Sequence, residues 1–350
     1  MRLKHLMFAA GLHAIAELRV DRLLRSLVRG CGIILMFHRV RPDPRASFAP
    51  NGVLEITPEF LDGVLVQLRR EGFDIIPISQ VAARLEAPRH GHPFAVLTFD
   101  DGYRDNVEHA WPVLRRHGAP WTLFVTTEFA DGKGRLWWLE LEQAIAQLDC
   151  IAFREGGRRM LPARTSREKQ AAFTVIYQRL RAGPEERLRT VITDLAARAG
   201  IDGTRLVRGL CLGWKEICKL AHEADVTIGS HTVSHPILTK QDARTAVHEV
   251  GDSKAVLERR LGRPVSYFAY PFGDRSAAGA REFRFVREAG YAAAVTSRPG
   301  HLFPYHADHL HALPRVSING LFQSQAALRA LFSGAPFLVW NGHRVAPIET

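Results

Sequence analysis

Cysteine is scarce in this chain of 350 residues, and none of its four cysteines forms a Cys-x-x-Cys pair. This scarcity excludes a disulfide-framed secreted domain and a zinc ribbon, and it predicts a cytoplasmic protein with reduced thiols. No apolar run reaches the roughly 18 residues that a membrane-spanning helix needs, so we expect no transmembrane segment. Low-complexity sequence is also missing. Hydrophobic residues make up 46% and charged residues 24% of the chain, which predicts a folded core and excludes disorder.

Acidic residues are too few to balance the basic ones, and the formal net charge is +11. Such an excess is typical of proteins that meet nucleic acid, an anionic membrane or an acidic substrate. Nucleic acid is disfavoured, because the chain has no zinc-finger or RNA-binding motif and its arginines are scattered. Residues 1–30 carry Leu, Ile and Val at three- and four-residue steps, which predicts a basic amphipathic helix. We favour packing of this helix on the protein's own surface, and the alternative is peripheral contact with an anionic inner membrane.

Short apolar runs alternate with helical patterns along most of the chain. Strands that are apolar on both faces and alternate with helices predict a parallel sheet or barrel. Residues 128–210 break this alternation with long charged helical stretches, and we interpret them as a helical insertion. We expect a barrel over 31–320, followed by a C-terminal helix and tail over 321–350. The predicted strands are residues 32–40, 73–77, 94–99, 121–126, 226–230, 267–270 and 292–296.

Two groups of polar residues directly follow predicted strands, where barrels and open α/β sheets carry their active sites. Asp100 and Asp101 follow residues 94–99, and His231 and His235 follow residues 226–230. Two adjacent carboxylates are costly to bury without a cation. The two histidines are four residues apart, a spacing that places both rings on one side of a helical turn. Two imidazoles and a carboxylate make a common site for a catalytic divalent metal, whereas solvated turns are the alternative for each motif alone.

In this order, the segments TFDDG (98–102), SHTVSH (230–235) and YFAYPFG (267–273) resemble the first three motifs of the polysaccharide deacetylases. These are the NodB-homology family, or carbohydrate esterase family 4. The resemblance implies a distorted (β/α)7, TIM-like barrel. It also implies a hydrolase of linear amides that removes N-acetyl groups from N-acetylglucosamine oligomers or polymers, such as chitooligosaccharides. The implied cofactor is a divalent metal, expected to be Zn, with Co, Ni and Mn as alternatives.

The resemblance also implies a role for each matching residue. Asp100 corresponds to the general base, and Asp101, His231 and His235 correspond to the metal ligands. The backbone N–H of Phe272 corresponds to the oxyanion donor, within the substrate-binding segment that includes Tyr270 and Pro271. The family's late motif supplies an acid His that is absent here. His38, at the end of an apolar strand, resembles the permuted acid of the poly-N-acetylglucosamine deacetylase branch. A structural His bonded to a nearby carbonyl is the alternative for His38.

The chain also departs from the family pattern. Ala269 stands where the family carries an arginine that pairs with the base, and Arg315 is a candidate replacement. Trp137 and Trp138 are candidates for stacking on sugar rings, and a place in the core of the insertion is the alternative. Histidines 301, 306, 309 and 311 are rival acids, most of which we expect to be solvated. We expect an acetylated amino-sugar oligomer or polymer as the substrate. The alternative function is a catalytically weak, sugar-binding relative with the same fold.

Overall fold

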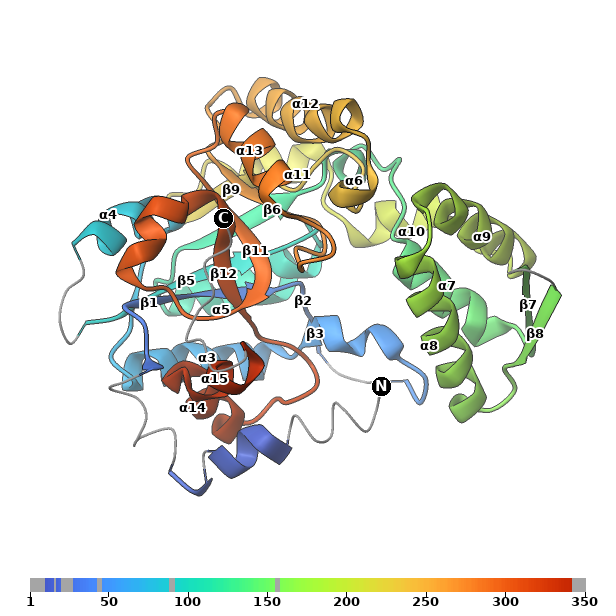
Figure 1. The fold of residues 1–350 in the computed structure, drawn as a ribbon, viewed down its shortest axis with the longest axis horizontal. Coiled ribbons are helices and arrows are strands. Elements are labelled where there is room, and N and C mark those ends of the chain that lie inside the picture. Colours follow the sequence, from blue (N-terminus) through green and yellow to red (C-terminus); the bar gives the residue numbers. More distant parts are fainter. Residues whose placement is uncertain are drawn as a thin grey trace.

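The computed structural model describes residues 10–15, 17–19, 28–42, 46–87, 92–154 and 158–341. Most of the predicted N-terminal helix therefore lies outside the described residues, as does the tail over 342–350. Residues 10–15 are helical, and Leu12 is buried in the main core. His13 Nε2 lies 3.2 Å from the Ser324 hydroxyl, so this segment packs beside the C-terminal helices (Figure 1). In the described part of the chain, no helix is long and apolar enough to cross a membrane.

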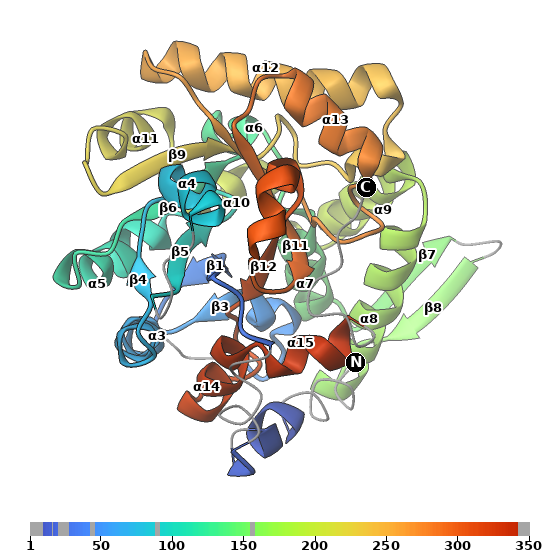
Figure 2. The same cartoon turned by 60° about the vertical axis from the view of Figure 1, so that its left-hand side comes forward.

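Seven parallel strands close into a barrel within the described residues, which confirms the predicted (β/α)7 fold (Figures 1 and 2). The barrel closes where β1 pairs with both β5 and β12. The eighth strand of the sheet, β4 (Asp74–Ile75), pairs only with the start of β5. In spatial order the barrel strands are β1 (Gly32–Phe37), β12 (Leu313–Ser317), β11 (Ala293–Pro299), β10 (Tyr267–Ala269), β9 (Val226–Ser230), β6 (Trp121–Val125) and β5 (Phe94–Phe99).

The sequence analysis missed β12, because Pro314 and Arg315 interrupt its apolar pattern. Proline lacks the N–H that a central strand donates, and arginine is rarely fully buried without a partner. Arg315 is nevertheless only 1% exposed, since its guanidinium finds buried partners inside the barrel. The strand therefore depends on a polar pairing that the strand's own sequence does not reveal.

Alternate residues of each strand face opposite sides of the barrel wall, as the period of two requires. Odd-numbered residues of β1 and β5, such as Leu35 and Leu97, join the core between barrel and helices. Ile34 and Val96 belong to a separate cluster inside the barrel. Following the same alternation, His38 and Asp100 come at the carboxyl ends of these strands on the interior side. The strand pattern thus directs both side chains into the mouth of the barrel.

Helices surround the barrel, and several begin with the caps that their sequences predict. Thr57 accepts from the Phe60 N–H at the start of α3, and Asp242 accepts from the Thr245 N–H at the start of α12. The helices outside the insertion include α3 (Pro58–Arg70), α4 (Val81–Glu86), α5 (Trp111–Arg116), α12 (Ala243–Leu261), α13 (Ala280–Glu288), α14 (Gln325–Ser333) and α15 (Ala335–Trp340).

The segment between β6 and β9 forms its own layer beside the barrel mouth and has its own hydrophobic core (Figure 1). It is not purely helical, because β7 and β8 pair as an antiparallel hairpin that the sequence analysis did not anticipate. We call residues 127–210 the insertion. Its elements are α6 (Thr127–Ala130), α7 (Trp137–Gln147), β7 (Cys150–Arg154), β8 (Arg158–Pro162), α8 (Ser166–Ala182), α9 (Glu185–Arg198) and α10 (Gly203–Leu210); α11 (Trp214–Leu220) leads back to the barrel.

Candidate active site

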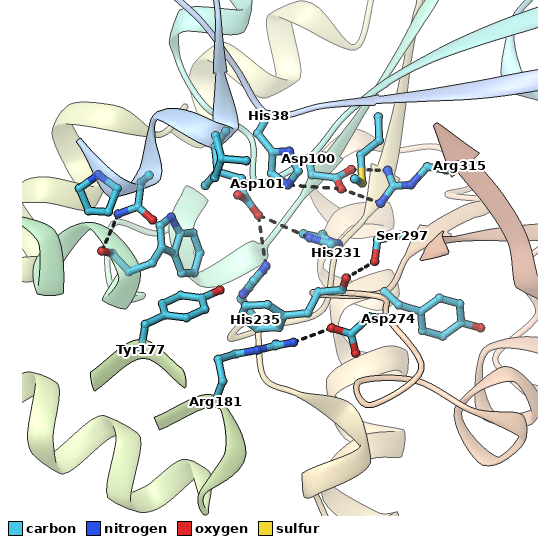
Figure 3. Close-up of a pocket in the computed structure, with 18 residues that line it drawn as sticks. His38, Asp100, Asp101, Tyr177, Arg181, His231, His235, Asp274, Ser297 and Arg315 are labelled. Atoms are coloured by element: carbon cyan, nitrogen blue, oxygen red, sulfur yellow. Dashed lines mark hydrogen bonds and ion pairs between the residues drawn. The ribbon is translucent and has the colours of Figure 1, made fainter. Parts of the chain in front are cut away.

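Three buried side chains meet at the carboxyl ends of β5 and β9 (Figure 3). The Nε2 atoms of His231 and His235 lie 3.4 and 3.2 Å from Oδ1 of Asp101. The Nδ1 of His231 donates to the Ala269 carbonyl at 2.7 Å, so a neutral ring presents the lone pair of Nε2 to Asp101. Oδ1 of Asp101 is buried and has no hydrogen-bond partner among the described residues. A buried carboxylate oxygen left without a partner between two imidazole nitrogens fits a divalent cation.

The backbone at this cluster lies in the left-handed region that non-glycine residues rarely adopt. The φ angles are +70° at Asp101, +67° at Thr232, +59° at His235 and +61° at Phe272. The expected helical turn at 231–235 is therefore wrong. The Thr232 hydroxyl instead accepts from the His235 N–H at 3.1 Å within a tight turn, which brings the two imidazoles together. Strained backbone of this kind persists only where surrounding structure holds it, and it concentrates at functional sites.

Asp100 is buried beside the cluster and is held by Arg315 of β12. The guanidinium donates to both carboxylate oxygens, at 2.8 and 2.7 Å. Burial by itself raises the pKa of Asp100, but the charge and hydrogen bonds of Arg315 outweigh it and hold that pKa below its usual range. Arg315 also donates to the Thr296 carbonyl and the Thr98 hydroxyl, which fixes its orientation. The missing arginine at Ala269 is thus replaced from another strand.

His38 follows β1, and its Nε2 lies 4.0 Å from Oδ2 of Asp100. Burial lowers the pKa of His38, against the two aspartates that raise it. A lower pKa makes the protonated ring a stronger acid. The backbone beside it is fixed, because Asn106 donates to the His38 carbonyl at 2.8 Å. Arg39, the next residue, donates to the buried Asp105 at 2.8 Å.

Four other histidines are candidates for the acid, and none of them lines the cavity that holds Asp100: His301, His306, His309 and His311. His301 is buried, accepts from the Gly30 N–H and lies 2.9 Å from the Leu331 carbonyl. His306 is also buried, so the expectation that most of the four are solvated does not hold for these two.

The cluster opens into a cavity of about 430 Å³ between the barrel mouth and the insertion (Figure 3). Trp138, Tyr270 and Phe272 line this cavity, whereas Trp137 and Pro271 do not. Trp137 instead stacks on Tyr177, with ring centroids 5.2 Å apart, inside the core of the insertion.

The Phe272 N–H donates no hydrogen bond to any described residue. Its carbonyl accepts from the Ser297 hydroxyl, and the Ser297 N–H donates to the Gly273 carbonyl at 3.0 Å. These bonds hold the turn after β10 while leaving its N–H available. A fixed backbone N–H without an intramolecular acceptor is suited to a developing oxyanion.

The cavity residues that escaped the sequence analysis include Tyr177 and Arg181 of α8, and Asp274 after β10. The only signal in the sequence is the four-residue spacing of Tyr177 and Arg181, which places both on one helix face. Many surface helices share that pattern.

A sequence profile described as polysaccharide deacetylase matches residues 88–294, which is more than half of the chain. The chain belongs to the polysaccharide deacetylase family. The predicted family is therefore confirmed. The profile begins before β5 and ends in β11, so in this family member it includes Asp100, Asp101, His231 and His235 but excludes His38 and Arg315.

Solved structures share the fold with this family member at low sequence identity. The deacetylase PplD of Streptococcus pyogenes, solved with acetate, aligns at a TM-score of 0.53 and 18% identity over 82% of this chain and 92% of that one. IcaB from Ammonifex degensii aligns at 0.53 and 19% over 87% and 97%. The de-N-acetylase of Aggregatibacter actinomycetemcomitans aligns at 0.53 and 13% over 83% and 95%. No curated protein matches the chain significantly.

Proposed function

We propose that this protein is a metal-dependent hydrolase that removes N-acetyl groups from oligo- or polysaccharides containing N-acetylglucosamine. The observation that carries the proposal is the arrangement at the barrel mouth. A buried carboxylate, Asp100, is kept ionised by Arg315 directly beside the three converging ligands Asp101, His231 and His235. A protein that only binds sugar needs no buried base in this position, whereas an enzyme that hydrolyses amides needs one.

Asp101, His231 and His235 are the proposed ligands of a divalent cation, for which Zn²⁺ is our first candidate. When bound, such a cation supplies Lewis acidity, which polarises an acyl carbonyl and lowers the pKa of water. Asp100 accepts the proton of the attacking water, and Arg315 keeps its carboxylate oriented and ionised. The Phe272 N–H donates to the carbonyl oxygen as negative charge develops on it. His38 delivers a proton to the departing amine nitrogen.

The deciding experiment is acetate release from chitooligosaccharides by the metal-loaded protein and its Asp100→Asn variant. We expect the rate to fall by about 10²- to 10⁴-fold, since general-base catalysis is lost while the three ligands remain. Metal content measured by mass spectrometry should stay equal to that of the wild type. Asp62→Asn, at a carboxylate paired with His117 on the surface, is the matched control and should retain full activity.

Unchanged activity in Asp100→Asn would rule out this residue as the base. Saccharide binding by the wild type without any acetate release would instead identify a catalytically weak, sugar-binding relative.

We also propose that the protein acts in the cytoplasm and makes peripheral contact with an anionic membrane surface, while residues 10–15 pack on the protein itself. The motivation is the net charge of +11, which a neutral saccharide substrate does not require. Release of the protein from membranes by high salt is the expected result. A fully soluble fraction at low salt would contradict it.

A further inference from the structure

The insertion sends two polar side chains into the cavity from outside the barrel. Tyr177 and Arg181 lie one turn apart on α8 and line the same cavity as the metal ligands. In Figure 3 the Tyr177 hydroxyl and the Arg181 guanidinium both point away from α8 toward the barrel mouth. The mechanism proposed above uses neither residue.

Arg181 is held in place before any ligand arrives. Its Nη2 donates to Oδ2 of Asp274 at 2.6 Å, and its guanidinium carbon lies 4.1 Å from the centre of the Phe272 ring. The backbone behind it is also anchored, because the Lys240 ammonium donates to the carbonyls of Arg181 and Gly183. An arginine ordered in advance loses little conformational entropy when it binds a ligand.

The fixed guanidinium keeps one of its terminal nitrogens without an acceptor. Nη1 of Arg181 is buried and has no hydrogen-bond partner among the described residues. Leaving a buried donor unpaired is costly, so such a group is expected to have an acceptor in the functional complex. Tyr177 is ordered in a similar way, since its ring stacks between Trp137 and Phe173, with ring centroids 5.2 and 5.5 Å away. No described residue forms a hydrogen bond with its hydroxyl.

The chemistry of this group matches a neutral sugar better than an anion. Asp274 already balances the charge of Arg181, so the pair offers a donor and an acceptor without a net charge. The Tyr177 hydroxyl both donates and accepts, as sugar hydroxyls do. Trp138 and Phe272 add aromatic surface in the same cavity, on which the CH face of a pyranose packs.

We propose that Tyr177, Arg181 and Asp274 form a subsite for a neutral sugar residue of the acylated saccharide, and that the insertion thereby determines substrate specificity. This inference rests on the proposed function. The catalytic groups at the strand ends hydrolyse the amide, and the α8 subsite selects the saccharide that carries it.

Binding without turnover provides the test. Fully N-acetylated chitotetraose, called chitotetraose below, is titrated calorimetrically into metal-loaded Asp100→Asn protein, with and without Arg181→Ala. We expect Arg181→Ala to raise the Kd by about 10- to 100-fold, because a hydrogen bond from a charged donor is lost. Tyr177→Phe, which keeps the ring, should raise it by a few fold. Arg167→Ala removes the same charge from an exposed site on the same helix and should leave the Kd unchanged.

A second measurement separates sugar recognition from chemistry. In the otherwise wild-type protein, Arg181→Ala should keep the hydrolysis of 4-nitrophenyl acetate, which has no sugar, within about twofold. Thermal unfolding confirms that each variant is folded, and Arg181→Gln replaces Arg181→Ala if the latter is not.

An unchanged Kd in Arg181→Ala, no binding of chitotetraose at all, or an equal loss on the aryl ester would each overturn the subsite. Chitotetraose binding that depends on Arg181, in a wild-type protein that releases no acetate, would overturn the proposed function and support the subsite.

Discussion

The barrel mouth and the insertion line one cavity with side chains held in different ways. At the barrel mouth, Asp100 and His231 directly follow strands that pair on both edges, and their partners are buried backbone or charged groups. In the insertion, Tyr177 and Arg181 project from a helix that rests on a separate hydrophobic core. Under the two proposals above, the strands carry the reactive groups, whereas the helical layer selects the saccharide.

The strongest test of this division removes a proposed metal ligand from the barrel mouth. His235→Ala should lose bound metal and reduce acetate release by about 10³-fold or more, because Lewis acidity supplies several kcal/mol of transition-state stabilisation. Metal analysis and acetate release measure both effects. His248→Ala, at an exposed histidine of α12, is the control and should behave as the wild type. If the His235→Ala protein kept both its metal and its activity, the barrel-mouth cluster would not be the catalytic site.

The second test concerns the ion pair between Arg315 and Asp100. Arg315→Ala leaves a buried carboxylate without its partner, and we expect a loss of about 3–5 kcal/mol in the free energy of unfolding. Chemical denaturation measures this loss. Arg315→Lys keeps the charge without the two-pronged geometry and should lose less stability but most of kcat. If Arg315→Lys retained full kcat, orientation of Asp100 by a guanidinium would not matter.

The third test measures how stability depends on pH, because the buried His301, which follows β11, has a strongly shifted pKa. Burial lowers the pKa of His301 from 6.5 to about 4. Between these pH values the unfolded chain binds a proton that the folded chain does not. The free energy of unfolding therefore falls as the pH drops from 6.5 toward 4, by up to roughly 3 kcal/mol. Denaturation of His301→Gln across this range should show a shallower loss, and an identical slope would contradict the assignment.

The smallest expected effect is on the KM of variants of the two tryptophans at the start of α7. Trp138 lines the cavity and its indole N–H donates to the Tyr103 hydroxyl at 3.2 Å, whereas Trp137 packs inside the insertion. Trp138→Phe should raise KM for chitooligosaccharides by a few fold, and Trp137→Phe should leave KM within about twofold while costing about 1 kcal/mol of stability. Steady-state kinetics and thermal unfolding distinguish them. Equal KM values would place sugar contact elsewhere.

Apolar runs that alternate with helical patterns predicted a parallel sheet or barrel and polar residues after its strands, and the resemblance of the motifs to the polysaccharide deacetylases implied the barrel. The sequence did not predict β12, where Arg315 is buried because Asp100 and two further partners lie opposite it. It also mistook the turn at 231–235 for a helical turn, since positive φ at Thr232 and His235 has no signature in these residue types. The roles of Tyr177 and Arg181 depend on how the insertion docks, which no local pattern encodes.

The strand that closes the barrel, β12, also brings the arginine that binds Asp100. β1 lies between β5 and β12, so His38, Asp100 and Arg315 meet where the beginning and the end of the barrel sequence join. Asp101, His231 and His235 follow β5 and β9, whereas Arg315 comes from β12, the last barrel strand in the sequence. Until that strand docks, Asp100 has no guanidinium beside it. The ion pair of Asp100 therefore needs the complete barrel sequence, and a chain that stops before β12 lacks the guanidinium that the proposed base requires.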